Sequence, residues 1–276
     1  GGTPSKISSV DRVDYANDTA TASPKGPLSS VLNQMGAVSS REYDNPLKGP
    51  GFITESSAFG VFSAPGPVPF GTNFGYFGGG WSSMSTVDRV DYSNDTATAS
   101  SKGPLSDGRG TLGAAGNTSF GYFGGGFGPK STVDRVDYSN DTATASSKGP
   151  LSESRRDVTA TGNASFGYFG GGEPDTSTVD RIDYSNDTAT AVAKGPLTTN
   201  RKRAAATGNQ NFGYFGGGLG TSRVDRVDYS NDTANASPKG PLSGSKQYLA
   251  ATGNSNFGYF GGGGSGLSTV DRIDYS

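Results

Sequence analysis

The phrase Phe-Gly-Tyr-Phe-Gly-Gly-Gly is the first stretch of this sequence that could do chemistry, because glycine-rich loops can cradle phosphate groups. It begins at residue 74 and returns at residues 120, 166, 212 and 257. No Lys-Ser or Lys-Thr pair follows it, and no helical pattern provides the helix N-terminus that phosphate loops use. We therefore interpret these glycines as structural turns.

The segment that contains Asp91, Ser93 and Asp95 is spaced like the start of a calcium loop. It lacks the glycine and the distal bidentate Glu that such a loop needs, so a hairpin turn is favoured over a calcium site. The chain has no Cys and no His, which excludes thiol chemistry, Cys/His zinc sites and imidazole triads. Carboxylates recur in every copy of the repeat, whereas an active site is normally unique. We expect no catalysis, no metal and no cofactor.

The composition limits the fold and the partners. Only 31% of the 276 residues are hydrophobic and 45 are glycine, which favours short strands and turns over long amphipathic helices. The net charge is −2 and no basic block appears, so we do not expect nucleic acid as a partner. No apolar run approaches the ~20 residues of a membrane span, and no signal peptide is visible. Both ends fall inside the repeat, so we expect the chain to be a segment of a longer one.

The whole sequence is organised by a repeat of about 46 residues. Its copies share three phrases, namely Phe-Gly-Tyr-Phe, Val-Asp-Arg-(Val/Ile)-Asp-Tyr and Lys-Gly-Pro-Leu. The second phrase starts at Val10, Val87, Val133, Val179, Val224 and Val270. The longest interval between these positions holds an irregular insert at about 30–70, which could be a degenerate blade or a loop that leaves the fold, and which is a further candidate partner contact.

Each copy divides into four extended pieces: Ala-Ala-Thr-Gly-Asn or its equivalent, Phe-Gly-Tyr-Phe, Ser-Thr-Val-Asp-Arg-Val-Asp-Tyr and Ala-Thr-Ala-Ser. In the second piece, the two-residue period of a strand places Phe166 and Tyr168 on one face and Phe169 on the other. Four short strands in about 46 residues are typical of a β-propeller blade. We predict one all-β domain over residues 1–276, a propeller of four-stranded antiparallel blades.

The number of blades depends on how the ring closes. The sequence is compatible with five to seven blades: five if the last Phe-Gly-Tyr-Phe pairs with the first Asp-Arg-Val-Asp-Tyr, six if the insert contains a blade, and seven if the chain is a fragment. We favour closure by a mixed blade that takes two strands from each end of the chain.

The pattern resembles the kelch repeat, which has a di-glycine after strand two, a Tyr in strand three, a bulky residue seven places later and a basic residue after strand four. The glycines match at Gly170 and Gly171. The tyrosines match at Tyr15, Tyr92, Tyr138, Tyr184 and Tyr229. The basic residues match at Arg109, Arg155, Arg201 and Lys246. The bulky position departs from the family pattern, with Ala22, Ala99, Ala145, Ala191 and Ala236, and the Phe and Tyr of Phe-Gly-Tyr-Phe could supply the missing volume.

The copies differ almost only in two windows, after the glycines and after Lys-Gly-Pro-Leu. In an up-and-down blade these windows are the 2–3 and 4–1 connections, which lie on one face of the ring. We predict a ligand- or partner-binding surface there, with unconstrained drift and packing against another chain as the alternatives. Its candidate residues are Trp81, Met84, Phe127, Lys130, Arg156, Lys202, Arg203, Arg223 and Tyr248.

The charged residues that recur in every copy are expected to be structural. Asp88, Arg89 and Asp91 could form a ladder of ion pairs around the ring, with Asp capping loops and Arg satisfying backbone carbonyls. The basic residues after strand four, such as Arg155, are expected to support the fold rather than to bind a ligand.

The amino-acid sequence of the repeat also resembles repeat proteins of marine tailed phages of the cyanophage type. That resemblance implies a non-enzymatic structural or binding module in a tail fibre or similar virion appendage. Its variable loops would contact a cell-surface glycan or another virion protein. The expected location is the virion or the extracellular space, and the chain could form a homo-oligomer. The alternative is an extracellular adhesin or spacer in which the repeats form a linear array.

Overall fold

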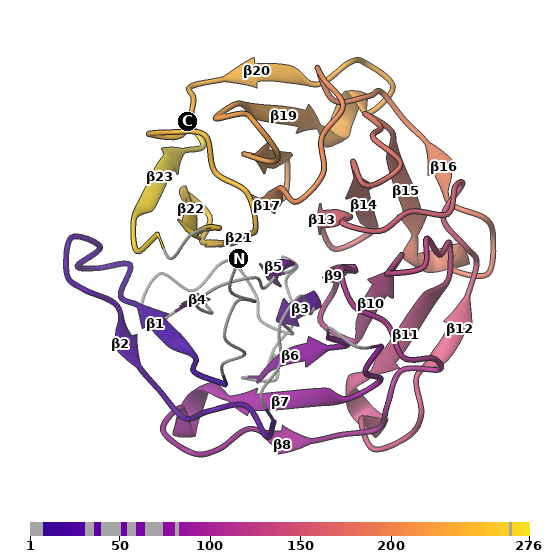
Figure 1. The fold of residues 1–276 in the computed structure, drawn as a ribbon. Helices are drawn as coiled ribbons and strands as arrows, with labels where there is room; N and C mark the ends of the chain where they lie inside the picture. Colours follow the sequence, from indigo (N-terminus) through magenta and orange to yellow (C-terminus); the bar gives the residue numbers. More distant parts are fainter. Residues whose placement is uncertain are drawn as a thin grey trace.

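The repeats form blades arranged around a common axis, as the computed structural model of the chain shows in Figure 1. The structure describes residues 8–30, 36–39, 51–53, 59–63, 74–80, 83–264 and 267–276. Within them every regular element is a strand or a short 3-10 turn, and no helix is long and apolar enough to cross a membrane. The prediction of an all-β propeller is confirmed.

Three blades are complete four-stranded antiparallel sheets, with strands in sequence order from the inside of the ring to its rim. Their strands are β9 (Gly113–Gly116), β10 (Phe120–Gly124), β11 (Val133–Asp137), β12 (Ser146–Lys148), β13 (Thr159–Gly162), β14 (Phe166–Gly170), β15 (Val179–Asp183), β16 (Val192–Ala193), β17 (Ala205–Gly208), β18 (Phe212–Gly216), β19 (Val224–Asp228) and β20 (Ser237–Lys239).

Two further blades contain the Phe-Gly-Tyr-Phe-Gly strand, so that five repeat blades build the propeller. One has the order β5–β3–β6–β7–β8 and the other β21–β22–β23. Their strands are β3 (Gly36–Ser39), β5 (Phe59–Ser63), β6 (Phe74–Gly78), β7 (Val87–Asp91), β8 (Ser100–Ser101), β21 (Leu249–Gly253), β22 (Phe257–Gly262) and β23 (Val270–Asp274). The 3-10 turns after strand three are η1 (Tyr92–Asn94), η2 (Tyr138–Asn140), η3 (Tyr184–Asn186) and η4 (Tyr229–Asn231).

A sixth sheet without the Phe-Gly-Tyr-Phe strand completes the ring between the last repeat blade and the first (Figure 1). It consists of β1 (Asp11–Val13), β2 (Ser23–Pro24) and β4 (Gly51–Ile53), in the order β2–β1–β4. The mixed-blade closure is therefore wrong: β22 pairs with β23 of its own copy, and β1 pairs with β4 of the insert.

The insert contributes strands to the ring instead of leaving it, so the alternative of a loop outside the fold is wrong for its described parts. β3 is the inner neighbour of β6, and β4 is the inner neighbour of β1. β5 pairs in parallel with β3 and lies beside the innermost strands β9, β13, β17 and β21, near the centre of the ring. The other residues of about 30–70 lie outside the described part of the chain, so the insert as a partner contact and the single-domain boundary of 1–276 stay predictions.

The fourth strand begins later than the sequence predicts. The Ala-Thr-Ala-Ser piece was expected to be extended, but β12 starts only at its serine, Ser146. The residues before it bond elsewhere: the N–H of Ala143 closes a turn onto Asn140, and the N–H of Ala145 donates to the carbonyl of Pro104 in the preceding blade at 2.8 Å. The segment therefore links two blades before it joins its own sheet.

Successive side chains of the Phe-Gly-Tyr-Phe strand face opposite neighbours, as the two-residue period predicts. Tyr168 stacks on Tyr229 of the following blade, with ring centroids 4.5 Å apart. Phe169 points the other way, onto Gly124 of the preceding blade, where an added Cβ would lie 2.8 Å from the phenyl ring. The aromatic ring of one blade thus fills the space that glycine leaves on the next. Buried Ala145 and Ala191, at the position of the bulky kelch residue, lie in the same apolar cluster as this phenylalanine.

Five junctions between neighbouring sheets are each organised around one carboxylate of the following sheet. Asp141 accepts a hydrogen bond from the hydroxyl of Tyr76 at 2.9 Å and from Nη1 of Arg89 at 2.7 Å, and Nζ of Lys102 lies 3.4 Å away. The main-chain carbonyl of this Asp accepts from the N–H of Gly103 at 2.8 Å. All three phrases of one copy therefore meet the Asn-Asp-Thr turn of the next. We call the Asp of this turn the junction carboxylate, found at Asp18, Asp95, Asp141, Asp187 and Asp232.

The ladder of ion pairs around the ring is confirmed in part. The Arg of the Val-Asp-Arg phrase takes part in it, but its partner is the junction carboxylate and not the neighbouring acids. Asp88 accepts from the N–H and Oγ of Ser29, and Asp91 caps the N–H of Ser93. Both acids cap loops, as expected.

The same contacts join the two ends of the described chain. Asp18 accepts from the hydroxyl of Tyr259 at 2.9 Å and from Nη1 of Arg272 at 2.7 Å. These two donors, the hydroxyl first, hold the pKa of Asp18 below its ordinary value, while burial foremost raises the pKa of Tyr259 to about 12. At neutral pH the acid is charged and the phenol keeps its proton, as the hydrogen bond requires. The ring is closed, and the linear array is wrong.

The glycine that receives the neighbouring phenyl ring should not tolerate a methyl group. We expect Gly124→Ala to lower the free energy of unfolding by about 1–3 kcal/mol, because Phe169 has to move from a packed position. Urea denaturation of purified protein measures this change. The matched control is Gly240→Ala, where an added Cβ meets nothing within 4 Å. Equal stability changes in the two variants would contradict the packing argument.

Candidate binding face

In four of the repeat blades the two variable windows lie side by side, because their backbones are hydrogen-bonded to each other. Arg156 in a 4–1 connection and Glu173 in the 2–3 connection of the same blade exchange two such bonds, at 3.0 and 2.7 Å. One equivalent bond is present in each of three other blades, from Phe127 to Gly110, from Leu219 to Lys202 and from Gly264 to Gln247. The prediction that both windows share one face is confirmed, and we call this surface the variable face.

A second feature of the variable face is a repeated left-handed backbone position that is occupied by residues other than glycine. Its occupants are Thr111, Asp157, Arg203 and Tyr248, with φ between 56° and 60°. Their backbones form an arc in which the N–H groups of Asp157, Arg203 and Tyr248 donate to the carbonyl of the equivalent residue in the preceding blade, at 2.8, 3.4 and 2.9 Å. Such conformations cost of order 1–3 kcal/mol for residues with a Cβ, and they cluster at functional sites.

Sequence reasoning missed Thr111 and Asp157, which stand at this left-handed position, although it named the other two occupants. Comparison of the copies does show a column of Thr, Asp, Arg and Tyr here. None of these is the glycine that normally marks a left-handed residue, so the residue types carry no conformational signal.

Two Arg–aromatic pairs dominate the described part of the variable face. Arg156 lies over the ring of Phe127 at 5.2 Å and donates to Oε1 of Glu173 at 2.6 Å. Arg203 lies over the ring of Tyr248 at 4.8 Å and contacts Oδ2 of Asp157 at 3.2 Å. In both pairs an acid holds the guanidinium in place, so the aromatic ring and the cation are presented together.

Lys202 links these groups, since its Nζ lies 3.0 Å from Asp175 and 3.3 Å from Glu173. The hydrogen bond from Arg156 is the main cause that lowers the pKa of Glu173, and the bond to Asp175 is the main cause that raises the pKa of Lys202. Burial raises the pKa of Asp157, and the nearby Arg203 opposes that shift. The cluster therefore carries balanced charges and is not a strongly basic or acidic patch.

The remaining sequence candidates have different surroundings. Lys130 pairs with Asp107 of the adjacent 4–1 connection. Met84 is partly buried and packs on the apolar cluster that includes Phe77, so it belongs to the scaffold. Arg223 is exposed, and Trp81 lies outside the described residues. Exposed Leu219, which the sequence analysis did not single out, adds an apolar side chain to the face.

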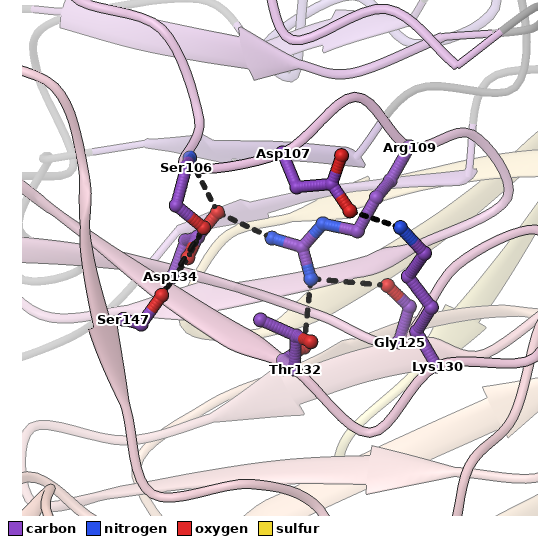
Figure 2. A network of polar contacts seen from close by, with 8 residues as sticks. All are labelled: Ser106, Asp107, Arg109, Gly125, Lys130, Thr132, Asp134 and Ser147. Carbon is purple, nitrogen blue, oxygen red and sulfur yellow. Dashed lines mark hydrogen bonds and ion pairs between the residues drawn. The ribbon is translucent and has the colours of Figure 1, made fainter.

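Beneath the variable face, the basic residue after strand four is buried in a scaffold network (Figure 2). Arg109 donates to Oδ2 of Asp134 at 2.5 Å and to the carbonyl of Thr132 at 2.8 Å. Asp134 also accepts from the N–H and Oγ of Ser106. Equivalent ion pairs, at 2.6 to 2.7 Å, are Arg155–Asp180, Arg201–Asp225 and Lys246–Asp271. The structural role predicted for these basic residues is confirmed.

The acids that resemble the start of a calcium loop are used within the fold. Asp91 caps Ser93, and Asp95 accepts from Arg12 at 2.8 Å with Lys25 3.5 Å away. Among the residues that the structure describes, no three His, Cys, Asp or Glu side chains gather as metal ligands would.

No protein-family model matches the chain, and no curated protein matches it. The class that the fold defines is the β-propeller, an architecture consistent with a binding or structural module. The sites named from the sequence stay predictions as binding residues.

Two adjacent arginines have different roles: Arg155 belongs to the scaffold, and Arg156 belongs to the variable face. Removing the charge of Arg155 leaves Asp180 buried without its cation, so we expect Arg155→Met to lower the free energy of unfolding by about 3–5 kcal/mol. Arg156→Met removes a half-exposed pair and should cost less than about 1 kcal/mol. Chemical denaturation of both variants measures the difference. A larger loss in Arg156→Met would show that the two positions have been assigned the wrong roles.

Proposed function

We propose that this protein is a non-enzymatic binding module that engages a macromolecular partner through its variable face. The proposal rests on the observation that repeated positions and variable positions have different structural roles. The near-identical phrases of the repeat supply the blade junctions, as at Asp141, and the buried pairs beneath the face, as at Arg109. The positions that differ between copies lie together on one side of the ring.

The side chains on that side favour recognition over drift. Phe127 is 43% exposed and Leu219 is 50% exposed, and Arg156 and Arg203 are each held beside an aromatic ring by an acid. Aromatic residues and Arg are enriched among the residues that dominate binding energy at interfaces. Positions that drift without function would not be expected to retain paired and stacked side chains on a strained backbone.

The setting we propose is a virion appendage such as a phage tail fibre, with a cell-surface glycan or another virion protein as the partner. The support is the similarity of the repeat sequence to kelch-type repeats and to repeat proteins of marine tailed phages. Aromatic rings with adjacent carboxylates and guanidinium groups suit sugar faces and hydroxyls. We propose no enzymatic activity, because the chain has no His or Cys and its recurring carboxylates serve loop caps and blade junctions.

A glycan array probed with labelled protein tests this proposal. We expect saturable binding by the wild-type chain and a loss of at least about tenfold in the variant Phe127→Ala/Arg203→Ala/Tyr248→Ala, since each residue is of a type that dominates interfaces. The matched control is Thr142→Ala/Thr188→Ala/Thr233→Ala, in the exposed 3–4 turns on the opposite side of the ring.

The control variant should bind as the wild type does and keep its melting temperature, and both variants should remain folded at the assay temperature. If the turn variant loses binding while the variable-face variant retains it, the proposed face is wrong. If no glycan binds, the glycan partner is wrong.

A further inference from the structure

The charges of the variable face are unevenly distributed between neighbouring blades. All three acids of its polar cluster belong to the loops of the β13–β16 blade. The two variable windows of the β17–β20 blade, residues 198–206 and 219–223, contain four cationic residues and no acid. The windows of the next blade along the chain, 243–251 and 264–268, also contain no acid. The cations of the β17–β20 blade are therefore balanced only from the side of the β13–β16 blade.

Two of these four cations are fully engaged within the protein. Arg201 is buried in the scaffold network, and Lys202 lies between two acids of the β13–β16 blade, at 3.0 and 3.3 Å. The other two are not. Arg223 is exposed, and no acid is paired with it in the described residues. Arg203 uses only its Nε, which contacts Oδ2 of Asp157 at 3.2 Å. Arg203 and Arg223 are therefore the cations of this blade that a ligand can engage.

The guanidinium of Arg203 has a free fork. Its two amino groups, Nη1 and Nη2, have no hydrogen-bond partner among the described residues. On Arg156, by contrast, Nη2 is bonded to Glu173 at 2.6 Å. The side chain of Arg203 is 27% exposed, so a ligand can reach it. Two parallel N–H donors on a planar group match the two oxygens of a carboxylate, which makes a carboxylate the fitting ligand.

Arg203 is also held in place before any ligand binds. Its guanidinium lies over the ring of Tyr248 at 4.8 Å, and its Nε is fixed by Asp157, which is buried. Its backbone has φ of 60° and is bonded on both sides, to the carbonyl of Asp157 at 3.4 Å and from the N–H of Tyr248 at 2.9 Å. A group fixed in this way loses little conformational freedom on binding, which favours affinity.

We propose that this part of the variable face binds an acidic saccharide, in which the carboxylate of a sugar acid is held by the fork of Arg203. Arg223, in the other window of the same blade, is a second contact for an anionic group of the chain of sugars. This inference rests on the proposed function, because it names the chemical class of the glycan. The net charge of the protein is −2, so an acidic glycan is not attracted to the molecule as a whole and its binding depends on this local site.

The experiment compares each acidic glycan with its own neutral form. Glycans that contain uronic or sialic acids are printed beside the methyl esters of the same glycans, and both are probed with the labelled 276-residue chain. Esterification removes the charge and leaves the rest of the sugar unchanged. We expect the esters of the bound glycans to bind at least about tenfold more weakly, because a charge-assisted pair of hydrogen bonds is lost. Binding of the acids should weaken as the salt concentration rises.

Variants of the protein locate the bound carboxylate. Arg203→Lys keeps the charge and removes the fork, and Arg203→Gln removes both, so both should weaken binding of the acid and reduce its advantage over the ester. Arg223→Gln should also weaken the acid, and its exposed position keeps the test valid if the Arg203 variants fold poorly. The matched control is Lys239→Gln, which removes one exposed cation from β20 at the rim of the same blade and should leave affinity unchanged.

The possible failures separate this inference from the proposed function. If glycans bind without a preference for the acid over the ester, or if the preference survives in both Arg203→Gln and Arg223→Gln, the inference is overturned and the proposed function stands. An equal loss of binding in Lys239→Gln would also overturn it, since the effect would then reflect total charge. If no glycan binds in either form, this inference and the glycan partner are both wrong.

Discussion

The junction carboxylate is the interaction on which the rest of this propeller depends. Only 31% of the residues of this glycine-rich chain are hydrophobic, so the apolar surface that it can bury is limited and its blades are joined by specific polar contacts as well as by packing. Asp141 receives a phenol, a guanidinium and an ammonium group from the preceding blade, each from a different part of that copy. A change in any of these phrases would leave donors or an acid unmatched, which gives a physical reason for their near-identity between copies.

Packing inside the ring obeys a second constraint, that of close approach. Phe169 seats on Gly124, and Tyr168 stacks on Tyr229, so each aromatic strand serves two junctions at once. The polar contacts at the rim and the aromatic packing in the interior join the blades without using the residues on one side of the ring. The variable face occupies that side, and its loops are held by backbone bonds that accept any side chain. The side chains of the variable face can therefore change from blade to blade without a change in how the blades associate.

Short sequence patterns correctly predicted the features that depend only on local geometry. The period of two placed Tyr168 and Phe169 on opposite faces, and the order of strands placed both variable windows on one side. The partner of Arg89 could not be found in this way, because Asp141 lies 52 residues further along the chain and nearer acids appear equally suitable. The left-handed position at Arg203 was missed because arginine carries no signal for that conformation. Closure was wrong because the insert, whose pattern is irregular, supplies β4 to β1.

A double-mutant cycle across one junction tests the central claim most directly. Asp141→Asn, Arg89→Met and the double variant would be compared with the wild type by urea unfolding, with Asp137→Asn as a control in the cap of the neighbouring 3-10 turn. We predict a loss of about 2 kcal/mol or more for Asp141→Asn and a coupling energy of about 1 kcal/mol with Arg89. Strictly additive changes, with Asp141→Asn no more damaging than Asp137→Asn, would contradict the account.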